Sequence, residues 1–365
     1  MKRVVIVFTR GCIVGGIRNF GLSLARNIED TQVDFLVFTK DKSFELPELN
    51  ELGGKVYTID SKPDVYTVSE KLRNIMAVFH FFKEHKYDAI HCNITSKYSD
   101  DAFYLLAAKL YGVNTRIVHS HHAEKDTGKK SLKLRLYEGV VGTVYKMSVT
   151  DRIGCSKLAY DCVFDDDLKK VKKHVIYNGI NVDKFYYPVK EINGNSNIKL
   201  CSVGRFSKEK NFVFLIRVFN ALLKRREDLQ LNIVGYGEQE DEIKAEIDKF
   251  GIEDRVKLYP GNTDVAAFLK EQDVYIMPSL YEGYPITLAE AQTAGLHCFV
   301  AANVTKEADV GLCEFIEGYD EETWAQIIDT RLKHMEAVDL KKEIYEKFDE
   351  KKMAERFRKV YYGEE

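Results

Sequence analysis

The sequence predicts an α/β protein built of two Rossmann-like, doubly wound domains that follow one another along the chain. Short apolar runs rich in β-branched residues alternate with longer stretches of helical spacing, which is typical of βαβ units. This alternation stops near the middle of the chain and then begins again. The chain has 365 residues, of which 45% are hydrophobic, and this is enough for two domains with separate cores. We therefore expect two parallel sheets, each covered by helices on both faces.

The individual elements are expected from the length and pattern of these runs. In the first half, buried strands are expected at 4–8, 34–38, 55–59, 89–92 and 116–119. Helices are expected between them at 17–28, 69–84 and 99–111. In the second half, strands are expected at 198–203, 231–234, 256–259, 274–277 and 297–300. The helices of that half are expected at 212–224, 238–250 and 286–295.

The two halves join between about residues 178 and 196. Residues 178–181 (Asn-Gly-Ile-Asn) read as a turn, and residues 188–196 are polar with little periodicity. We therefore place the first domain at 1–178 and the second at 179–345. Residues 346–365 are expected to form a charged C-terminal helix, which either closes the second domain or packs back on the first.

Composition argues against several classes of protein. The seven cysteines stand singly, without a C-x-x-C pair, which disfavours a disulfide framework and a cysteine-rich zinc site and suits a reducing cytosol. The apolar run at 4–8 is too short for a signal peptide, and no later run reaches membrane-spanning length. We expect a cytoplasmic protein, soluble or peripheral on the inner face of the cell membrane.

The net charge of −3 is unevenly distributed along the chain. Residues 1–180 hold 28 Lys and Arg against 22 Asp and Glu, a net charge of +6. The remainder holds 26 against 35, a net charge of −9. Two interpretations stay open: the charges form ordinary solvated faces, or the first half meets an anionic partner such as lipid phosphates. No nucleic acid partner is expected.

A glycine-rich loop at 11–16 follows the first expected strand and precedes a helix. Gly15 and Gly16 would let the backbone approach a ligand, and the helix N-terminus offers N–H groups to an anion. The loop lacks the spacing G-x-G-x-x-G, and the second strand runs into Thr39-Lys40 instead of an acidic residue. A dinucleotide-dependent oxidoreductase is therefore not expected, and a tight turn without a ligand stays the alternative.

Three histidines lie at the end of the strand at 116–119, in the sequence His119-Ser120-His121-His122. Open α/β sheets bind their ligands at this edge. A polar active-site role is favoured over a structural role. A metal site is disfavoured because no partner set of carboxylates and histidines is nearby, and no cofactor is expected.

Two cations flank the turn after the first strand of the second domain. Arg205 follows Gly204, and Lys210 precedes the helix at 212–224. A forked guanidinium, a point charge and a helix N-terminus together suit a pyrophosphate. Solvated loop charges are the alternative. Gly235 adds a second glycine turn after the next strand, which is a weak indication by itself.

The segment 278–292 carries two carboxylates, Glu282 and Glu290, on either side of a turn formed by Gly283-Tyr284-Pro285. Their spacing alone is weak, since it occurs elsewhere in the chain, but the turn between a strand and a helix places Glu282 on the loop and Glu290 about one turn into the helix. A carboxylate can accept two hydroxyl hydrogens, so the pair suits a sugar and a ribose in one cleft. Two carboxylates flanking a single glycosidic bond would be arranged differently.

Together and in this order, these segments resemble the retaining glycosyltransferase family 4 of the GT-B fold, especially its capsular and exopolysaccharide branch. The resemblance spans nearly the whole chain and rests on 15–16, 119–121, 175–181, 203–211 and 279–295. It implies a transferase that moves a hexose or N-acetylhexosamine from a nucleotide diphosphate sugar, with UDP favoured, to a growing lipid-linked surface polysaccharide. The donor would lie in a cleft between the two domains, and no metal would be needed.

The resemblance also implies roles for single residues. Arg205 and Lys210 would hold the diphosphate, Glu290 the ribose and Glu282 the donor sugar, while His121 would lie near the transferred sugar. Gly16 would let the N-terminal loop close over the phosphates and acceptor. The remaining donor-binding positions would be Gly15, Gly204, Gly235, Gly283, Tyr284, Pro285 and Ile286. The sequence departs from the family pattern at His122-Ala123-Glu124, so acceptor contacts can differ there, and at Asn181, where the family usually has aspartate.

The family retains the anomeric configuration of the sugar, and this sequence shows no evident nucleophile. The resemblance therefore implies a same-face substitution, in which the leaving diphosphate accepts the proton of the acceptor. Stabilisation of that leaving group by Arg205 and Lys210 would be the main contribution of the protein. Two alternatives stay open: a nucleotide-sugar epimerase of the same architecture, and a non-catalytic sugar-nucleotide-binding subunit.

A basic segment at 125–135 opens an expected helix in the positive half of the chain. Its cations include Lys129, Lys130 and Lys133, and leucines at 132, 134 and 136 alternate with them. One interpretation is reversible docking on an anionic membrane surface through these lysines. The other is that the apolar residues simply face the core.

Overall fold

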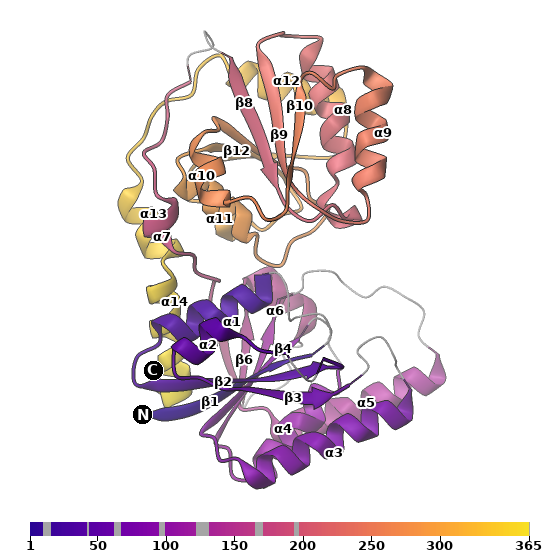
Figure 1. The fold of residues 1–365 in the computed structure, drawn as a ribbon, viewed down its shortest axis with the longest axis vertical. Coiled ribbons are helices and arrows are strands. Elements are labelled where there is room, and N and C mark those ends of the chain that lie inside the picture. The colour runs from indigo at the N-terminus through magenta and orange to yellow at the C-terminus, as the bar shows by residue number, and fades with distance from the viewer. Residues whose placement is uncertain are drawn as a thin grey trace. The chain divides into compact units, whose positions relative to one another are not determined.

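The computed structural model describes residues 1–9, 16–41, 44–61, 67–94, 99–121, 131–164, 171–192 and 197–364 (Figure 1). The chain forms two compact units. Unit 1 comprises Met1–Gly179 together with Glu350–Glu365, and unit 2 comprises Ile180–Asp349. Each unit is built on one parallel sheet, so the predicted fold class of two doubly wound α/β domains is confirmed. The predicted cleft between the domains stays a prediction.

The sheet of unit 1 has the strand order β3-β2-β1-β4-β5-β6-β7, with all described pairs parallel. The order reverses between β1 and β4, which is the switch point of a doubly wound sheet. The two strands after β5 are short and were not among the predicted strands. The bounds are β1 Lys2–Phe8, β2 Thr31–Thr39, β3 Val56–Asp60, β4 Ala89–Ile94, β5 Thr115–Ser120, β6 Asp151–Gly154 and β7 Lys172–Val175.

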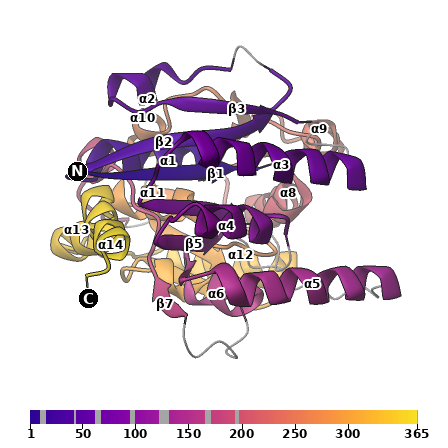
Figure 2. The ribbon, with the colours of Figure 1, turned by 90° about the horizontal axis from the view of Figure 1, so that it is seen from below.

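Helices cover the sheet of unit 1 on two sides, and an apolar core lies under each set. Val78, Leu105 and Val141 represent the core under α3, α4 and α5, and Leu24 and Phe357 represent the core under α1 and α14. Figure 2 shows α4 lying between α3 and α5. The bounds are α1 Gly16–Asn27, α2 Pro47–Glu51, α3 Val68–Glu84, α4 Asp101–Leu110, α5 Leu132–Ser148, α6 Lys157–Val163 and α14 Glu350–Tyr362.

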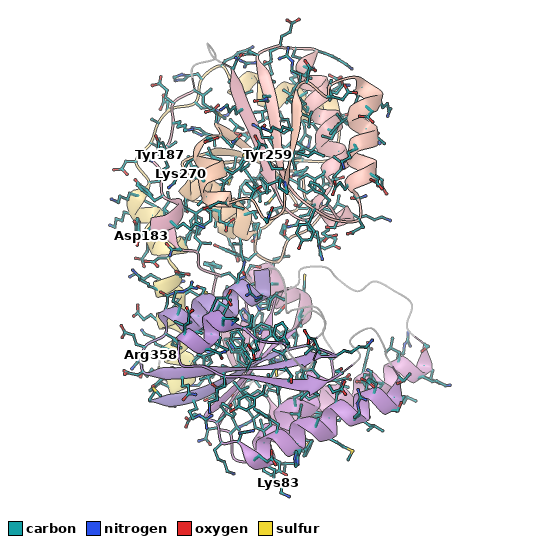
Figure 3. The ribbon with its side chains drawn as sticks, viewed as in Figure 1. Lys83, Asp183, Tyr187, Tyr259, Lys270 and Arg358 are labelled. Atoms are coloured by element: carbon teal, nitrogen blue, oxygen red, sulfur yellow. The ribbon has the colours of Figure 1, made fainter. Side chains whose placement is uncertain are left out.

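The C-terminal helix α14 packs against α1, at the start of the chain (Figure 1). Ser23 Oγ on α1 donates a hydrogen bond to Glu350 Oε2 over 2.6 Å, and both groups are buried. At the other end of α14, Lys2 Nζ donates to the carbonyl of Tyr361 over 2.9 Å. Arg358, labelled in Figure 3, has its guanidinium 4.5 Å from the ring centre of Tyr362. The last helix of the chain therefore completes the core of the first unit.

The sheet of unit 2 has the order β10-β9-β8-β11-β12-β13, and here the order reverses between β8 and β11. Its strands are β8 Ile198–Val203, β9 Leu229–Gly235, β10 Val256–Pro260, β11 Val274–Met277, β12 His297–Ala301 and β13 Cys313–Ile316. Its helices are α7 Val182–Phe185, α8 Phe212–Leu223, α9 Glu240–Phe250, α10 Val265–Lys270, α11 Ile286–Thr293, α12 Glu321–Arg331 and α13 Lys341–Phe348. Asp183 on α7, labelled in Figure 3, accepts a hydrogen bond of 2.6 Å from the Tyr345 hydroxyl on α13.

None of the helices in the described part of the chain combines the length and the apolar composition that a membrane span requires.

Candidate functional site

The predicted donor-binding residues of unit 2 gather at the switch point of its sheet. β8 and β11 are neighbouring parallel strands, so their carboxyl ends lie at the same edge. In open α/β sheets ligands bind at this edge and at this position in the strand order. Arg205 and Lys210 follow β8, and Glu282 follows β11.

Lys210 and Glu282 form a direct contact that bridges the two strand ends. Lys210 Nζ lies 2.6 Å from Glu282 Oε1, and Ser279 Oγ donates to the same oxygen over 2.8 Å. The two side chains are only 21% and 11% exposed. Since both groups are largely withdrawn from water, each depends on the other for charge compensation. A lysine and a carboxylate thus meet at the edge of the sheet where open α/β proteins bind their ligands.

Arg205 has a different environment from Lys210, although both follow the same strand. Its side chain is 63% exposed, and its Nη2 lies 3.1 Å from Glu209 Oε1, on the same turn. Within the described residues, no hydrogen bond or ion pair joins the Arg205 side chain to Lys210 or to Glu282. The structure therefore brings together Lys210 and Glu282, and leaves Arg205 at the solvent-exposed side of the turn with its neighbour Glu209.

The two glycines predicted for this edge differ in how much space surrounds them. A Cβ atom on Gly235 would lie 2.2 Å from the carbonyl oxygen of Gly204 and 2.4 Å from the Phe206 ring. The turns after β8 and β9 therefore touch through their backbones, and only glycine fits at 235. At Gly204 the nearest atom to an added Cβ would be 3.4 Å away, which is ordinary contact.

Glu290 lies five residues into α11, which begins at Ile286 directly after Pro285. Burial raises the pKa of its carboxyl to about 8, and the positive charge of Lys184 opposes that rise. Among the residues that the structure describes, none makes a hydrogen bond to this carboxyl. The group is therefore neutral at pH 7 in the unliganded protein and available to a ligand that carries hydroxyls. Gly283 and Tyr284 form the turn between Glu282 and α11, with Tyr284 and Pro285 buried.

Two residues that the sequence did not single out hold the loop after β11 in place. The Tyr319 hydroxyl donates to the Ser279 carbonyl over 2.8 Å, and Asn303 Nδ2 donates to the Leu280 carbonyl over 3.4 Å. Both residues follow strands of the same sheet, β13 and β12 respectively. The sequence could have indicated both residues, because each follows a strand and the carboxyl ends of parallel strands lie at one edge of the sheet.

In unit 1, the predicted His121 belongs to a cluster of aromatic and histidine side chains at the carboxyl ends of β4 and β5. His91 Nε2 lies 3.1 Å from His119 Nδ1, and His91 Nδ1 lies 2.7 Å from the Tyr361 hydroxyl of α14. The rings of His119 and His121 are 4.0 Å apart between centres. The edge of Phe20 on α1 contacts His121 with a centre distance of 5.4 Å. We call His91, His119 and His121 the histidine cluster.

The histidine cluster is neutral, because burial disfavours the charged imidazolium. Burial lowers the pKa of His91 and of His121 to about 3, and it lowers the pKa of His119 well below its usual value. The Tyr361 hydroxyl keeps its proton, since burial raises its pKa well above its usual value. Among the described residues its only hydrogen-bond acceptor is His91 Nδ1. Tyr361 therefore donates to His91, and His91 donates through Nε2 to His119 Nδ1.

Several predicted residues lie outside the described part of the chain, or away from the Lys210–Glu282 contact and the histidine cluster. Gly15, His122, Lys129 and Lys130 lie outside the described residues. Gly16 is the first residue of α1 and is exposed. Within the residues described, no group of three or more His, Cys, Asp or Glu side chains is arranged to hold a metal ion.

Lys133 lies on α5, next to an exposed apolar surface that extends over two helices. The leucines of α5 do not face the core: Leu132 is 73% exposed and Leu136 is 66% exposed, and only later does the helix bury Val141. A second exposed stripe of residues four apart lies on α3. We call these residues the α3–α5 surface: Val68, Leu72 and Met76 on α3, and Leu132, Leu134, Leu136 and Val140 on α5.

A polar contact links the two halves of the α3–α5 surface near the first turns of both helices. Lys71 Nζ on α3 donates to the Tyr137 hydroxyl of α5 over 3.2 Å, and both side chains contact Asp100, the residue before α4. In Figure 2, α3 and α5 reach past α4 on the same side. Exposed Lys133 and Arg135 flank the leucines of α5.

Comparisons with known proteins agree with this architecture. Residues 186–351, which include most of unit 2, match the family model described as "Glycosyl transferases group 1". EpsF of Bacillus subtilis (strain 168) is 28% identical over 328 residues, which cover 85% of this chain and 82% of EpsF. The Escherichia coli enzyme UDP-Gal:alpha-D-GlcNAc-diphosphoundecaprenol alpha-1,3-galactosyltransferase is 24% identical over 79% of this chain and 76% of its own length.

The fold also resembles solved structures along the whole chain. The crystal structure of Anabaena HepE in complex with UDP and glucose aligns with a TM-score of 0.74 at 15% sequence identity. The alignment covers 99% of this chain and 100% of the HepE chain. At this level of identity the likeness shows a shared fold.

Proposed function

We propose that this chain, which carries a group 1 glycosyl transferase domain over residues 186–351, is a retaining glycosyltransferase that uses a nucleotide diphosphate sugar. The sugar would be a hexose or an N-acetylhexosamine, and the acceptor a lipid-linked saccharide of a growing surface polysaccharide. UDP is the favoured nucleotide, because the E. coli relative is named for UDP-Gal and HepE was solved with UDP. The lipid-linked acceptor is suggested by the diphosphoundecaprenol in the name of the same relative.

The observation that carries this proposal is the contact between Lys210 and Glu282 at the switch point of unit 2. A diphosphate that enters this edge would take over Lys210 as its counter-charge, because it carries more negative charge than one carboxylate. Glu282 would then be released to accept hydrogen bonds from hydroxyls of the donor sugar. Glu290, which lacks a partner among the described residues, would bind the ribose.

The proposed reaction is a substitution on one face of the sugar ring. The bond between the anomeric carbon and the diphosphate oxygen breaks, and the acceptor oxygen forms its bond to the anomeric carbon on the same face. The proton of the acceptor hydroxyl passes to the leaving diphosphate oxygen. Lys210 stabilises the charge that develops on that oxygen, and His121 would lie beside the transferred sugar.

A donor panel with two readouts tests this proposal. The purified chain is incubated with UDP- and GDP-linked hexoses and N-acetylhexosamines, with and without an undecaprenyl diphosphate saccharide. We expect release of the nucleoside diphosphate that depends on the acceptor, and a product whose new linkage keeps the anomeric configuration of the donor. An epimerase would convert the sugar nucleotide without releasing diphosphate. A non-catalytic subunit would bind the nucleotide and release nothing.

We further propose that the α3–α5 surface docks the enzyme reversibly on an anionic membrane. The surface combines exposed apolar side chains with Lys133 and Arg135, and such a mixture suits the boundary between lipid headgroups and acyl chains. Each basic residue near an anionic leaflet contributes about 1 kcal/mol. The excess of basic residues in the first 180 positions favours the same partner.

Sedimentation with vesicles tests the docking proposal. We expect binding to vesicles of phosphatidylcholine with phosphatidylglycerol at low salt, and little binding to phosphatidylcholine alone or at high salt. Changing Lys133 and Arg135 together to Glu should weaken binding by at least about tenfold. Leu136→Glu should also weaken it, whereas Leu110→Glu, an equally exposed leucine at the far end of α4, should not. Binding that ignores lipid charge would contradict the proposal.

A further inference from the structure

Asn93, a residue at the end of β4 that the sequence did not single out, contacts the side chain of His121. Asn93 is buried, and its Oδ1 lies 2.9 Å from His121 Nε2. The other end of the same amide, Nδ2, faces the carbonyl oxygen of Val7 over 3.5 Å. Turning the amide over would place Oδ1 against the Val7 carbonyl, so that two hydrogen-bond acceptors would face one another in a buried site. The Val7 carbonyl therefore fixes the orientation of the Asn93 amide.

The orientation of this amide determines which nitrogen of His121 carries the proton. An amide oxygen can only accept, so Nε2 must be the protonated nitrogen. In a neutral imidazole the other nitrogen then carries a lone pair. His121 Nδ1 has no hydrogen-bond partner among the described residues, and the side chain is only partly buried. The ring itself is held between His119, at 4.0 Å, and Phe20, at 5.4 Å.

We propose that Asn93 is a positioning residue that holds His121 as the Nε2–H tautomer, so that Nδ1 accepts a hydrogen bond from a hydroxyl group of the bound saccharide. A histidine fixed in this way discriminates by chemistry: it binds a hydroxyl, which donates, and rejects a carbonyl or phosphate oxygen, which cannot. The identity of the hydroxyl as part of a saccharide rests on the proposed function. The tautomer of His121 does not rest on it.

The tautomer is measured directly by NMR on the chain labelled with ¹⁵N at histidine. Long-range correlations between ring nitrogens and ring protons distinguish the two tautomers, and the spectrum of His121→Gln identifies the signals of His121. We expect the Nε2–H form in the wild-type chain and in Asn93→Asp, because a buried carboxyl that faces the Val7 carbonyl stays protonated and its other oxygen accepts from Nε2–H. In Asn93→Leu, which has a similar volume and no acceptor, we expect the Nδ1–H form to become populated. A pure Nε2–H signal in Asn93→Leu would overturn the proposal.

Kinetics with the same two variants test what the tautomer does. Loss of one correctly directed hydrogen bond should lower the kcat of Asn93→Leu by about tenfold. Asn93→Asp should retain most of the kcat of the wild-type chain. The affinity for UDP, which is bound by unit 2, should be the same in the wild-type chain and in both variants. Equal loss in Asn93→Asp and Asn93→Leu, or a loss of UDP affinity in step with kcat, would show a merely structural role and overturn the proposal. If no donor is turned over at all, both the proposed function and the assignment of a saccharide hydroxyl to His121 Nδ1 are wrong. The NMR result still decides whether Asn93 sets the tautomer.

Discussion

Glu290 differs from an ordinary surface glutamate because its position on α11 partly buries its carboxyl. Burial raises its pKa from 4.5 to about 8, and the charge of Lys184 only partly opposes this rise. The folded protein therefore binds one more proton than the unfolded chain between these two pH values. Stability that depends on this proton is fully present below about pH 4.5 and is lost as the pH rises through about 8.

Glu290→Gln should remove this part of the pH dependence, because glutamine stays neutral at every pH. Between about pH 5 and pH 9 the wild-type protein should lose thermal stability relative to the variant, with a slope of at most about 1.4 kcal/mol per pH unit. Scanning calorimetry of both proteins across this range measures the difference. Glu253→Gln, which replaces an exposed glutamate of the same unit, serves as control. Parallel curves for wild type and Glu290→Gln would show that the carboxyl ionises normally.

Lys210 and Lys208 provide a matched comparison on one short turn, since they lie two residues apart. Lys210 is partly buried against Glu282, and Lys208 is exposed. Lys210→Ala should lower kcat on the order of 10²–10³-fold, because the leaving diphosphate loses its main counter-charge. Lys208→Ala should remain near wild type. Steady-state release of the nucleoside diphosphate measures both, and near-normal turnover by Lys210→Ala would remove the lysine from the mechanism.

At the scale of single residues, the sequence could predict which side chains follow strands at one edge of the sheet, and not how they pair. It singled out Lys210 and Glu282 as candidates because both follow expected strands, at the edge where α/β sheets bind their ligands. It could not show that these two form a pair while Arg205 contacts Glu209, since that depends on side-chain directions within a few ångströms. Asn93 and Tyr361 were missed because their roles come from contacts with residues far away in the chain.

At the scale of secondary-structure elements, the turns after β8 and β9 are packed too closely for any side chain at position 235. Gly235→Ala would drive a Cβ atom to 2.2 Å from the Gly204 carbonyl oxygen, so the turn that precedes Arg205 must shift. We expect this variant to lose about 1–3 kcal/mol of stability and to bind UDP more weakly. Denaturant unfolding and calorimetry with UDP measure the two effects.

Gly139→Ala is the control for this prediction, because an added Cβ at that helical position meets no atom within 4 Å. This substitution should leave UDP binding unchanged and raise stability by roughly 0.5–1 kcal/mol, the usual gain for alanine over glycine inside a helix. If Gly235→Ala behaved like Gly139→Ala, the close approach of the two turns would not matter for the site.

Composition explains which strands the sequence could predict. β11 has four residues and was predicted because Val274 to Met277 are all apolar. β6 and β7 are equally short, but they contain Asp151, Arg152, Lys172 and Lys173, so they resemble loops. A polar run of this length becomes a strand only because a neighbouring strand supplies its hydrogen bonds. The local sequence does not show which strand lies beside it, so such a strand is not predicted.

At the scale of the whole molecule, unit 1 is made from two separate parts of the chain. Phe357 and Tyr361 of α14 are fully buried in its core, and Tyr361 also fixes the hydrogen-bond direction in the histidine cluster. Local patterns could predict that the chain ends in a helix, and they left its place open between two domains. Only the tertiary packing of α14 against α1 resolves this choice.

Removal of residues 350–365 should therefore destabilise the first unit, although the deletion lies at the opposite end of the sequence. The loss of two large buried aromatic side chains alone corresponds to about 6–10 kcal/mol, which is comparable to the stability of a whole domain. Removal of only 363–365 should have little effect, since these residues follow the helix. Limited proteolysis with mass spectrometry measures this: the shorter deletion should stay resistant, and the longer one should be cut within 1–179. Equal resistance of both would contradict the packing.

The divided construction of unit 1 has a consequence for the order in which the protein matures on the ribosome. The strands of unit 1 are synthesised before unit 2, yet the helix that closes their core is synthesised only after all of unit 2. Unit 2 is continuous and can fold as soon as it emerges, while the earlier half waits with an exposed apolar face. A polypeptide released after unit 2 but before α14 would thus contain a folded unit 2 and an incompletely folded unit 1, which chaperones and proteases can recognise. Helix α14 in this way couples the folding of the strands of unit 1 to the synthesis of all of unit 2.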